Sequence, residues 1–80
     1  MSRVRVEYFA LLRERAGVNE ETIETSARTP EQLYAQLVER HGFDIDRARL
    51  KVAINAQFRD WQAPLSDGDE VVFIPPVAGG

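Results

Sequence analysis

The 80-residue sequence contains no cysteine, only one histidine, and no long apolar run. Without cysteine there can be no disulfide, no thiolate metal ligand and no thiol nucleophile. No stretch approaches the ~20 apolar residues that span a bilayer, and residues 1–3 lead into a strand pattern, so we expect a cytoplasmic protein without membrane contact. A net charge of −3, with no cluster of Lys and Arg, argues against nucleic acid as a partner.

Combinations of residues typical of enzymes are also missing. His41 is the only histidine, and it lies in the last turn of a predicted helix before Gly42, where a cation suits the negative end of the helix dipole. A base without an oriented neighbour is a poor candidate for proton transfer. No G-x-x-x-x-G-K loop is present to hold ATP, and we predict no metal site.

Hydrophobic periodicity predicts two helices and five strands. The expected strands are 3–8, 20–26, 51–55, 58–59 and 71–74, and the expected helices are 11–16 and 30–41. Thr29 and Gln32 form a capping box around Pro30 at the start of the longer helix. Residues 43–50 are expected to cross irregularly or to form a helical turn, and Ala56-Gln57 to form a hairpin turn. The unbroken apolar run 71–74 predicts a central strand covered on both faces.

This order of elements fits an α+β roll of the ubiquitin-like, or β-grasp, type. In such a roll a mixed sheet carries one main helix on one face, and the first and last strands pair in parallel at its centre. We assign residues 1–74 to this domain and residues 75–80 to a flexible C-terminal tail.

The tail is suited to entering another protein's active site. Its residues are Pro75, Pro76, Val77, Ala78, Gly79 and Gly80. The prolines stiffen the base, the glycines have no Cβ to obstruct a narrow channel, and the extended tail reaches roughly 20 Å. A terminal carboxylate is a poor acyl donor, so an ATP-using enzyme must first activate it in trans. Taken alone, the two glycines can equally be a frayed end or a cloning residue.

The alternation of side chains along the strands predicts an apolar surface on the face of the sheet that is expected to be solvent-exposed. The outward parity of Arg3, Arg5 and Glu7 extends to Phe9, and the parity of Glu70 brings further apolar side chains to the same side. The predicted partner-binding residues are Phe9, Phe58, Val72 and Ile74. A patch of this kind marks a partner site in a soluble monomer, unless residues 43–50 cover it.

Three stretches of the sequence resemble the small subunit of molybdopterin synthase. They are F-A-L-L-R-E at 9–14, D-G-D-E-V at 67–71 and F-I-P-P-V-A-G-G at 73–80. The first and third carry the resemblance, which spans the whole chain, whereas the second is a common hairpin. One departure is Ala56, because relatives often place glycine after the asparagine of this hairpin.

The resemblance implies a sulfur carrier of molybdenum cofactor biosynthesis. Gly80 would be adenylated by an E1-like enzyme that uses ATP in trans, and would then receive sulfur from a sulfur donor as a thiocarboxylate. Gly79 would give it clearance inside the large subunit of an expected heterotetramer, whose residues would perform the catalysis. There the sulfur would pass to cyclic pyranopterin monophosphate and form the molybdopterin dithiolene. The resemblance also implies apolar docking through Phe9, Phe58 and Ile74, and no cofactor bound by this chain itself.

Three alternatives stay open at this point. The chain can be a sulfur carrier for another pathway, such as thiamine thiazole synthesis or tRNA thiolation. It can be a ubiquitin-like modifier that is joined to lysines of target proteins. It can also be a plain interaction module whose tail has no chemical role.

Overall fold

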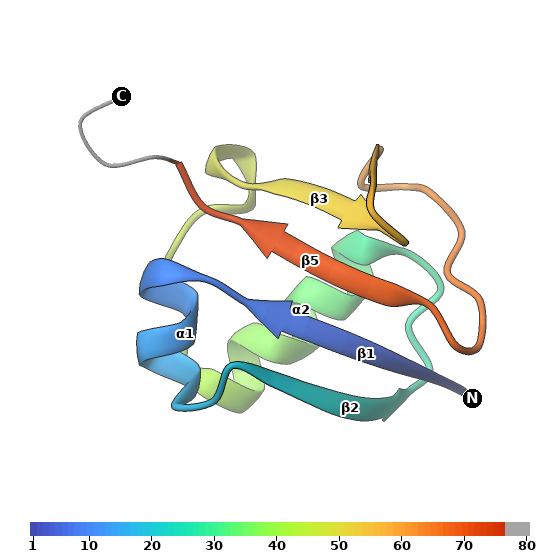
Figure 1. The fold of residues 1–80 in the computed structure, drawn as a ribbon, viewed down its shortest axis with the longest axis horizontal. Helices are drawn as coiled ribbons and strands as arrows, with labels where there is room; N and C mark the ends of the chain where they lie inside the picture. Colours follow the sequence, from blue (N-terminus) through green and yellow to red (C-terminus); the bar gives the residue numbers. More distant parts are fainter. Residues whose placement is uncertain (77–80) are drawn as a thin grey trace.

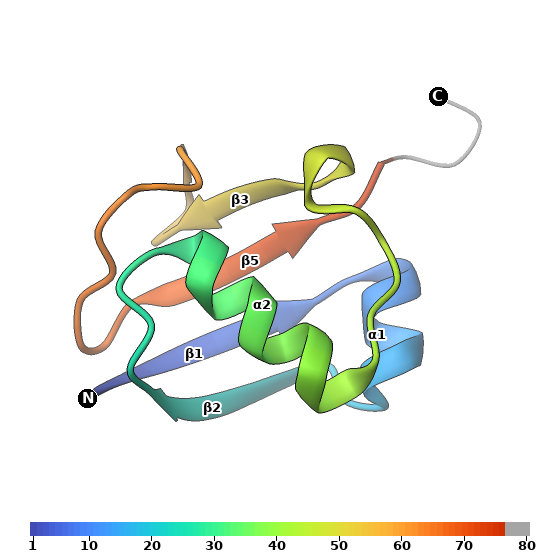
Figure 2. The ribbon, with the colours of Figure 1, turned by 180° about the vertical axis from the view of Figure 1, so that it is seen from behind.

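The structure, a computed structural model that describes residues 1–76, is a five-stranded mixed sheet with one long helix across one face (Figures 1 and 2). The elements are β1 (Ser2–Tyr8), α1 (Ala10–Ala16), β2 (Glu20–Thr25), α2 (Pro30–His41), a 3-10 turn (Arg47–Arg49), β3 (Lys51–Ile54), β4 (Gln57–Arg59) and β5 (Glu70–Ile74). The strand order is β2-β1-β5-β3-β4, with β1 and β5 parallel and the other pairs antiparallel. This is the predicted α+β roll.

The central strands follow the predicted alternation. Val4, Val6 and Tyr8 of β1 are almost fully buried, and Val6 pairs in register with Val71 while Tyr8 pairs with Phe73. Because a strand turns alternate side chains to opposite faces, these residues form one continuous apolar layer beneath α2. The predicted parallel pairing of the first and last strands is confirmed.

Both helices begin and end near the predicted positions. Thr29 caps α2, because its hydroxyl accepts a hydrogen bond from the Gln32 N–H at 3.3 Å. The Gln32 side chain accepts from the N–H of Arg28, one residue before the cap, at 2.8 Å, so the predicted box closes one residue earlier than its usual form. Gly42 ends α2 in the left-handed conformation, with φ at 73°.

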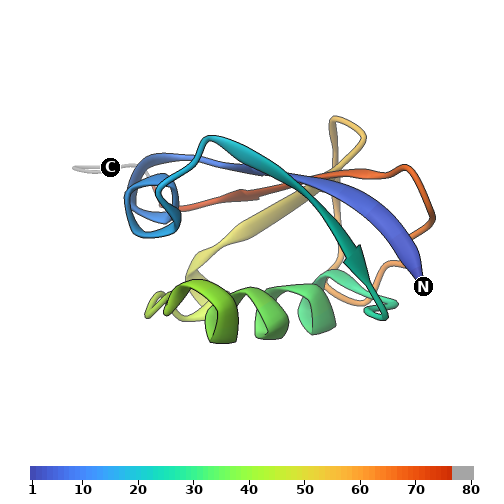
Figure 3. The same ribbon diagram turned by 90° about the horizontal axis from the view of Figure 1, so that it is seen from below.

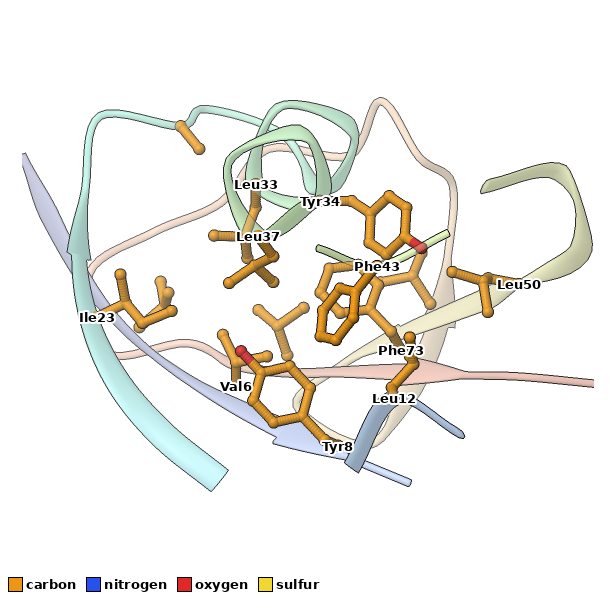
Figure 4. Close-up of a cluster of buried hydrophobic side chains, with 14 residues drawn as sticks. Val6, Tyr8, Leu12, Ile23, Leu33, Tyr34, Leu37, Phe43, Leu50 and Phe73 are labelled. Atoms are coloured by element: carbon orange, nitrogen blue, oxygen red, sulfur yellow. The ribbon is translucent and has the colours of Figure 1, made fainter. Parts of the chain in front are cut away.

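The core lies between the sheet and α2, and aromatic rings gather on one side of it (Figure 4). Tyr34 stacks on Phe43 and also contacts Phe73, and its hydroxyl donates to the Ile45 carbonyl at 2.6 Å. Phe43 and Leu50 belong to the core cluster and Ile45 packs against it, so both ends of segment 43–50 lie on the α2 side of the sheet. The alternative that this segment covers the opposite, predicted apolar face is therefore wrong.

Two details differ from the sequence-based expectation. Val71 and Phe73 are fully buried but Val72 and Ile74 are partly exposed, so β5 is covered on one face only and the prediction of cover on both faces is wrong. The hairpin turn is formed by Asn55 and Ala56, one residue earlier than predicted, with φ angles of 51° and 69°. Such paired left-handed residues match the right-handed twist of the flanking strands. Among residues 1–76, none of the helices is both long and apolar enough to cross a bilayer.

Candidate partner-binding face

The sheet face that points away from α2 carries an apolar row across three strands. Val72 of β5 pairs in register with Ala53 of β3, and Ala53 pairs with Phe58 of β4. Val71 and Phe73 on either side of Val72 are buried, as are Val52 and Ile54 on either side of Ala53, so Val72 and Ala53 face away from the core, and Phe58 shares their face as the register partner of Ala53. The long helix α2 lies on the other side of the sheet (Figure 3). Phe58 is 70% exposed, and no helix of the described residues covers this side.

A second row lies at the end of the sheet from which the chain leaves β5. Ile74 pairs with Lys51 of β3 on one side. On the other side, Tyr8 pairs with Phe73, and Phe9 continues the extended backbone of β1 with φ −127° and ψ 152°, so Phe9 lies beside Ile74. Phe9 is 41% exposed. We call Phe9, Ala53, Phe58, Val72 and Ile74 together the outer apolar face.

All four predicted partner-binding residues thus lie on the same side of the sheet. Ala53 is the member that the sequence reasoning missed, although the inward parity of Val52 and Ile54 was available to find it. Ala53 is only 8% exposed, and the strand register places it between Val72 and Phe58. The result is one apolar surface, of the kind that soluble proteins reserve for partners.

Ion pairs occupy the other half of this face, over β1 and β2. Arg5 pairs with Glu70 and lies 4.0 Å from Glu20, and Arg3 pairs with Glu24 at 3.2 Å. These pairs are exposed and contribute little to stability, but they compensate the charge on that half of the face. A partner that covers the apolar half therefore has to desolvate fewer charged groups than one that covers the half with the ion pairs.

The first residues after β5 follow the strand. Pro75 is buried and Pro76 is exposed, which continues the alternation of the strand by two residues. The remaining predicted tail residues, Val77, Ala78, Gly79 and the predicted reactive Gly80, lie outside the described residues. Strand β5 thus ends beside Phe9 and Lys51, at the edge of the outer apolar face.

The single histidine, His41, belongs to a polar cluster on the other side of the sheet, where α2 meets β2. Glu21 accepts from the Tyr8 hydroxyl at 2.5 Å and contacts His41 Nε2 at 2.5 Å, while Arg40 Nε lies 3.6 Å from its other oxygen. Burial acts to raise the pKa of Glu21, but the hydrogen bonds from Tyr8 and His41 and the charges of His41 and Arg40 outweigh it and hold that pKa below its usual value.

This cluster is structural in character. Burial, with the hydrogen bond to Glu21, raises the pKa of Tyr8, and the rings of Tyr8 and His41 meet edge to face at 5.6 Å. His41 is in the last turn of α2 as predicted, and its ring also ties the helix end to β2 through Glu21. Within residues 1–76 there is no group of three or more side chains placed to hold a metal ion.

The fold defines a ubiquitin-like β-grasp protein, with an open apolar face next to the point where the chain leaves β5. The chain belongs to the ThiS family, whose model matches residues 6–80. It is 43% identical to the molybdopterin synthase sulfur carrier subunit of Chlamydomonas reinhardtii, over 98% of this chain and 99% of that protein. The sulfur carrier subunit of Escherichia coli is 32% identical over 96% of this chain and 99% of its own length.

Solved structures agree with this assignment. A putative molybdopterin converting factor subunit 1 from Pyrococcus furiosus has a TM-score of 0.80 and 32% identity, covering 96% of this chain and all of the other. A complex of subunits 1 and 2 of the molybdopterin-converting factor from Helicobacter pylori matches with a TM-score of 0.68 and 29% identity, over 98% of this chain and 99% of the matched one. Small archaeal modifier protein 1 from Methanosarcina acetivorans has a TM-score of 0.80 and 25% identity, over 100% and 98% of the two chains.

Proposed function

We propose that this chain is the sulfur carrier subunit of a molybdopterin synthase and acts in the cytoplasm. Support comes from the family, from carrier subunits that align over nearly the full length of this chain, and from the two-subunit complex among the similar structures. The partner that follows from this proposal is the synthase large subunit, in a heterotetramer. An E1-like adenylating enzyme and a sulfur donor act before it.

The proposed chemistry takes place at Gly80. Its carboxylate attacks the α-phosphorus of ATP on the activating enzyme, which releases pyrophosphate and forms an acyl-adenylate. Hydrosulfide from the sulfur donor then attacks the carbonyl carbon, the bond from that carbon to the AMP oxygen breaks, and the products are the thiocarboxylate, AMP and a proton. Inside the large subunit this sulfur passes to cyclic pyranopterin monophosphate, and two deliveries build the dithiolene. The chain itself binds no cofactor in this scheme, because ATP is used in trans.

One observation carries the proposal. The chain leaves β5 at Pro75 and Pro76, beside Phe9 and Ile74, so the start of the tail adjoins the outer apolar face. A partner that covers this face therefore meets Pro75 and Pro76, the start of segment 75–80, at its own surface. Docking and delivery are coupled by geometry, which is what a carrier needs and an unrelated interaction module does not.

A ubiquitin-like modifier is the second candidate, favoured by the similarity to small archaeal modifier protein 1. The two roles differ in the fate of the activated carbonyl. A carrier exchanges one oxygen for sulfur and returns to the carboxylate, whereas a modifier forms an amide with a lysine of another protein. Intact-mass analysis of the purified chain and of its bound proteins separates these outcomes.

The deciding experiment adds one alanine after Gly80. We expect the extended chain to fold and bind the large subunit, but to form no thiocarboxylate and to support no dithiolene synthesis in a reconstituted system. The matched control places the extra alanine before Met1, whose side chain is 91% exposed, and should be fully active. Dithiolene synthesis by the carboxyl-extended chain would refute the proposal.

A further inference from the structure

A second surface feature lies next to the outer apolar face, at the outer edge of the sheet. It is a hollow of about 480 Å³ lined by Leu50, Lys51, Val52, Phe58, Arg59 and Trp61. Its size is in the range of sites that hold several side chains or a small molecule. Only Phe58 and Lys51 belong to the strand rows already described, so the hollow extends that surface around the edge of the sheet.

The hollow exists because β4 is short. Its pairing with β3 ends where Arg59 faces Val52, and the chain then turns away at Asp60. The Asp60 carboxylate accepts from the Gln62 N–H at 2.9 Å, and its carbonyl accepts from the Ala63 N–H at 3.0 Å. Lys51 is therefore the one residue of β3 beyond the β4 ladder on this side.

The far wall of the hollow is rigid. Trp61 stacks on Phe73 with ring centroids 5.7 Å apart and meets Tyr34 edge to face at 5.9 Å. The guanidinium of Arg47 lies 5.6 Å from the centre of its ring and also pairs with Glu31. Because these contacts fix the indole, the hollow is preformed and an incoming group does not have to order it.

The charge of the hollow is opposite to that of the chain. The sequence carries a net charge of −3, yet the lining contains two exposed cations, Lys51 and Arg59, and no acid. Neither cation makes an ion pair among the described residues, and the nearby carboxylates are engaged elsewhere, Asp60 by its turn and Glu31 by Arg47 and Gln62. Apolar walls with a basic rim suit an apolar anchor flanked by carboxylates.

We propose that this hollow binds an extended acidic segment of the partner protein, with an apolar side chain against Phe58 and Trp61 and carboxylates at Lys51 and Arg59. The partner is the large subunit, so this identity rests on the proposed function. Continuity supports it, because Phe58 belongs to both surfaces and a protein that covers the outer apolar face reaches the hollow without a break. The segment adds selectivity: a partner without these carboxylates leaves two cations desolvated and unpaired.

The first test uses the full chain and two capped hexapeptides with a Leu-Phe centre, one flanked on each side by two glutamates and the other by two lysines. In NMR titrations of the ¹⁵N-labelled chain, the acidic peptide should shift the amides of Lys51, Phe58 and Arg59 and the Trp61 indole N–H. The basic peptide should bind at least about tenfold more weakly. Equal binding of both peptides, shifts centred elsewhere, or no shifts would overturn the inference.

The second test measures the affinity of the large subunit by calorimetry for Lys51→Glu and Arg59→Glu. Arg28→Glu is the matched control, because Arg28 is exposed, lies outside the hollow and gives the same change in charge. We expect each hollow variant to bind about tenfold more weakly, with the difference shrinking at high salt, and the control to match the wild type. Equal affinity of all three variants would overturn the inference.

The two failures are distinguishable. If the wild-type chain does not bind the large subunit at all, the proposed function fails, but the peptide titrations still show whether the hollow binds an acidic segment. Sedimentation of the chain alone tests whether a second copy of the chain occupies the hollow. If the wild-type chain forms a dimer, and if Lys51→Glu and Arg59→Glu dissociate it, the occupant is a second copy and the assignment to the large subunit is overturned.

Discussion

Phe58→Ala tests the contribution of the outer apolar face to partner binding, at the residue that this face shares with the hollow. The side chain is 70% exposed in the free chain, so its removal leaves no cavity in the core. Surface substitutions of this kind change the free energy of unfolding by no more than about 0.5 kcal/mol. A loss of affinity in this variant therefore reports on the interface and not on the fold.

The size of the effect follows from the exposed area. A phenylalanine presents about 200 Å² when fully accessible, so a partner that covers this exposed side chain removes roughly 140 Å² from water. At about 25 cal/mol per Å², this burial stabilises the complex by up to about 3.5 kcal/mol. Because the alanine retains part of the contact, we expect a loss of about 2–3.5 kcal/mol, which is a weakening of roughly 30- to 300-fold.

The assay is calorimetric titration of the large subunit, with thermal unfolding of each variant measured alongside. Leu11→Ala is the control, because Leu11 is 60% exposed but lines a groove with Phe43 and Ile45, on the α2 side of the sheet. We expect the control to bind like the wild type. An affinity of Phe58→Ala within threefold of the wild type, or an equal loss in Leu11→Ala, would refute the assignment of the outer apolar face.

Three further predictions concern stability and docking. Glu21→Gln should destabilise the fold by about 1–3 kcal/mol near pH 7. Because the folded pKa of Glu21 is lowered, its stabilising contribution is present above the unfolded pKa of 4.5 and is lost as the pH falls. The melting temperatures of variant and wild type should therefore converge in acid, and a difference that stays constant with pH would contradict this. Ala56→Gly should stabilise by about 0.5–1 kcal/mol in denaturant titration, because Ala56 holds φ at 69°, whereas Gly68→Ala, at φ 89°, should destabilise. Ile74→Lys should abolish binding of the large subunit measured by calorimetry with little change in unfolding, since it places an unpaired charge in the interface; unchanged affinity would exclude Ile74 from it.

The sequence predicted the elements whose signals are local. Alternation in β1 and the cap at Thr29 depend on residues close in the chain, and the structure confirms both. The parity of Glu70, Val72 and Ile74 likewise predicted that the candidate partner-binding residues share one face, and the structure places them on one face. Where periodicity and capping agree, backbone geometry leaves little freedom for another arrangement.

The features that the sequence did not predict depend on where separate segments meet. Glu21 looked like one of several acids on a polar strand, and only the packing of α2 over β2 brings His41 and Tyr8 to its carboxylate. The hollow depends on the early end of β4 and on the stacking of Trp61 against Phe73. The apolar run of β5 misled because apolar residues on an open face and on a core face have the same pattern in sequence.

The parallel pairing of β1 and β5 places the start of segment 75–80 beside the face that we propose for partner binding. In an antiparallel pair, the residues that follow the two strands lie at opposite ends of the strands. In this parallel pair, Tyr8 and Phe73 are in register, so Phe9 and Ile74 lie side by side. Pro75 follows Ile74 at the same end of the strands. The outer apolar face therefore ends where the segment 75–80 begins, and a partner seated on that face holds the start of the segment in a fixed position. If the outer apolar face is the binding surface that we propose, the strand topology, more than the composition of segment 75–80, places Pro75 and Pro76 beside a bound partner.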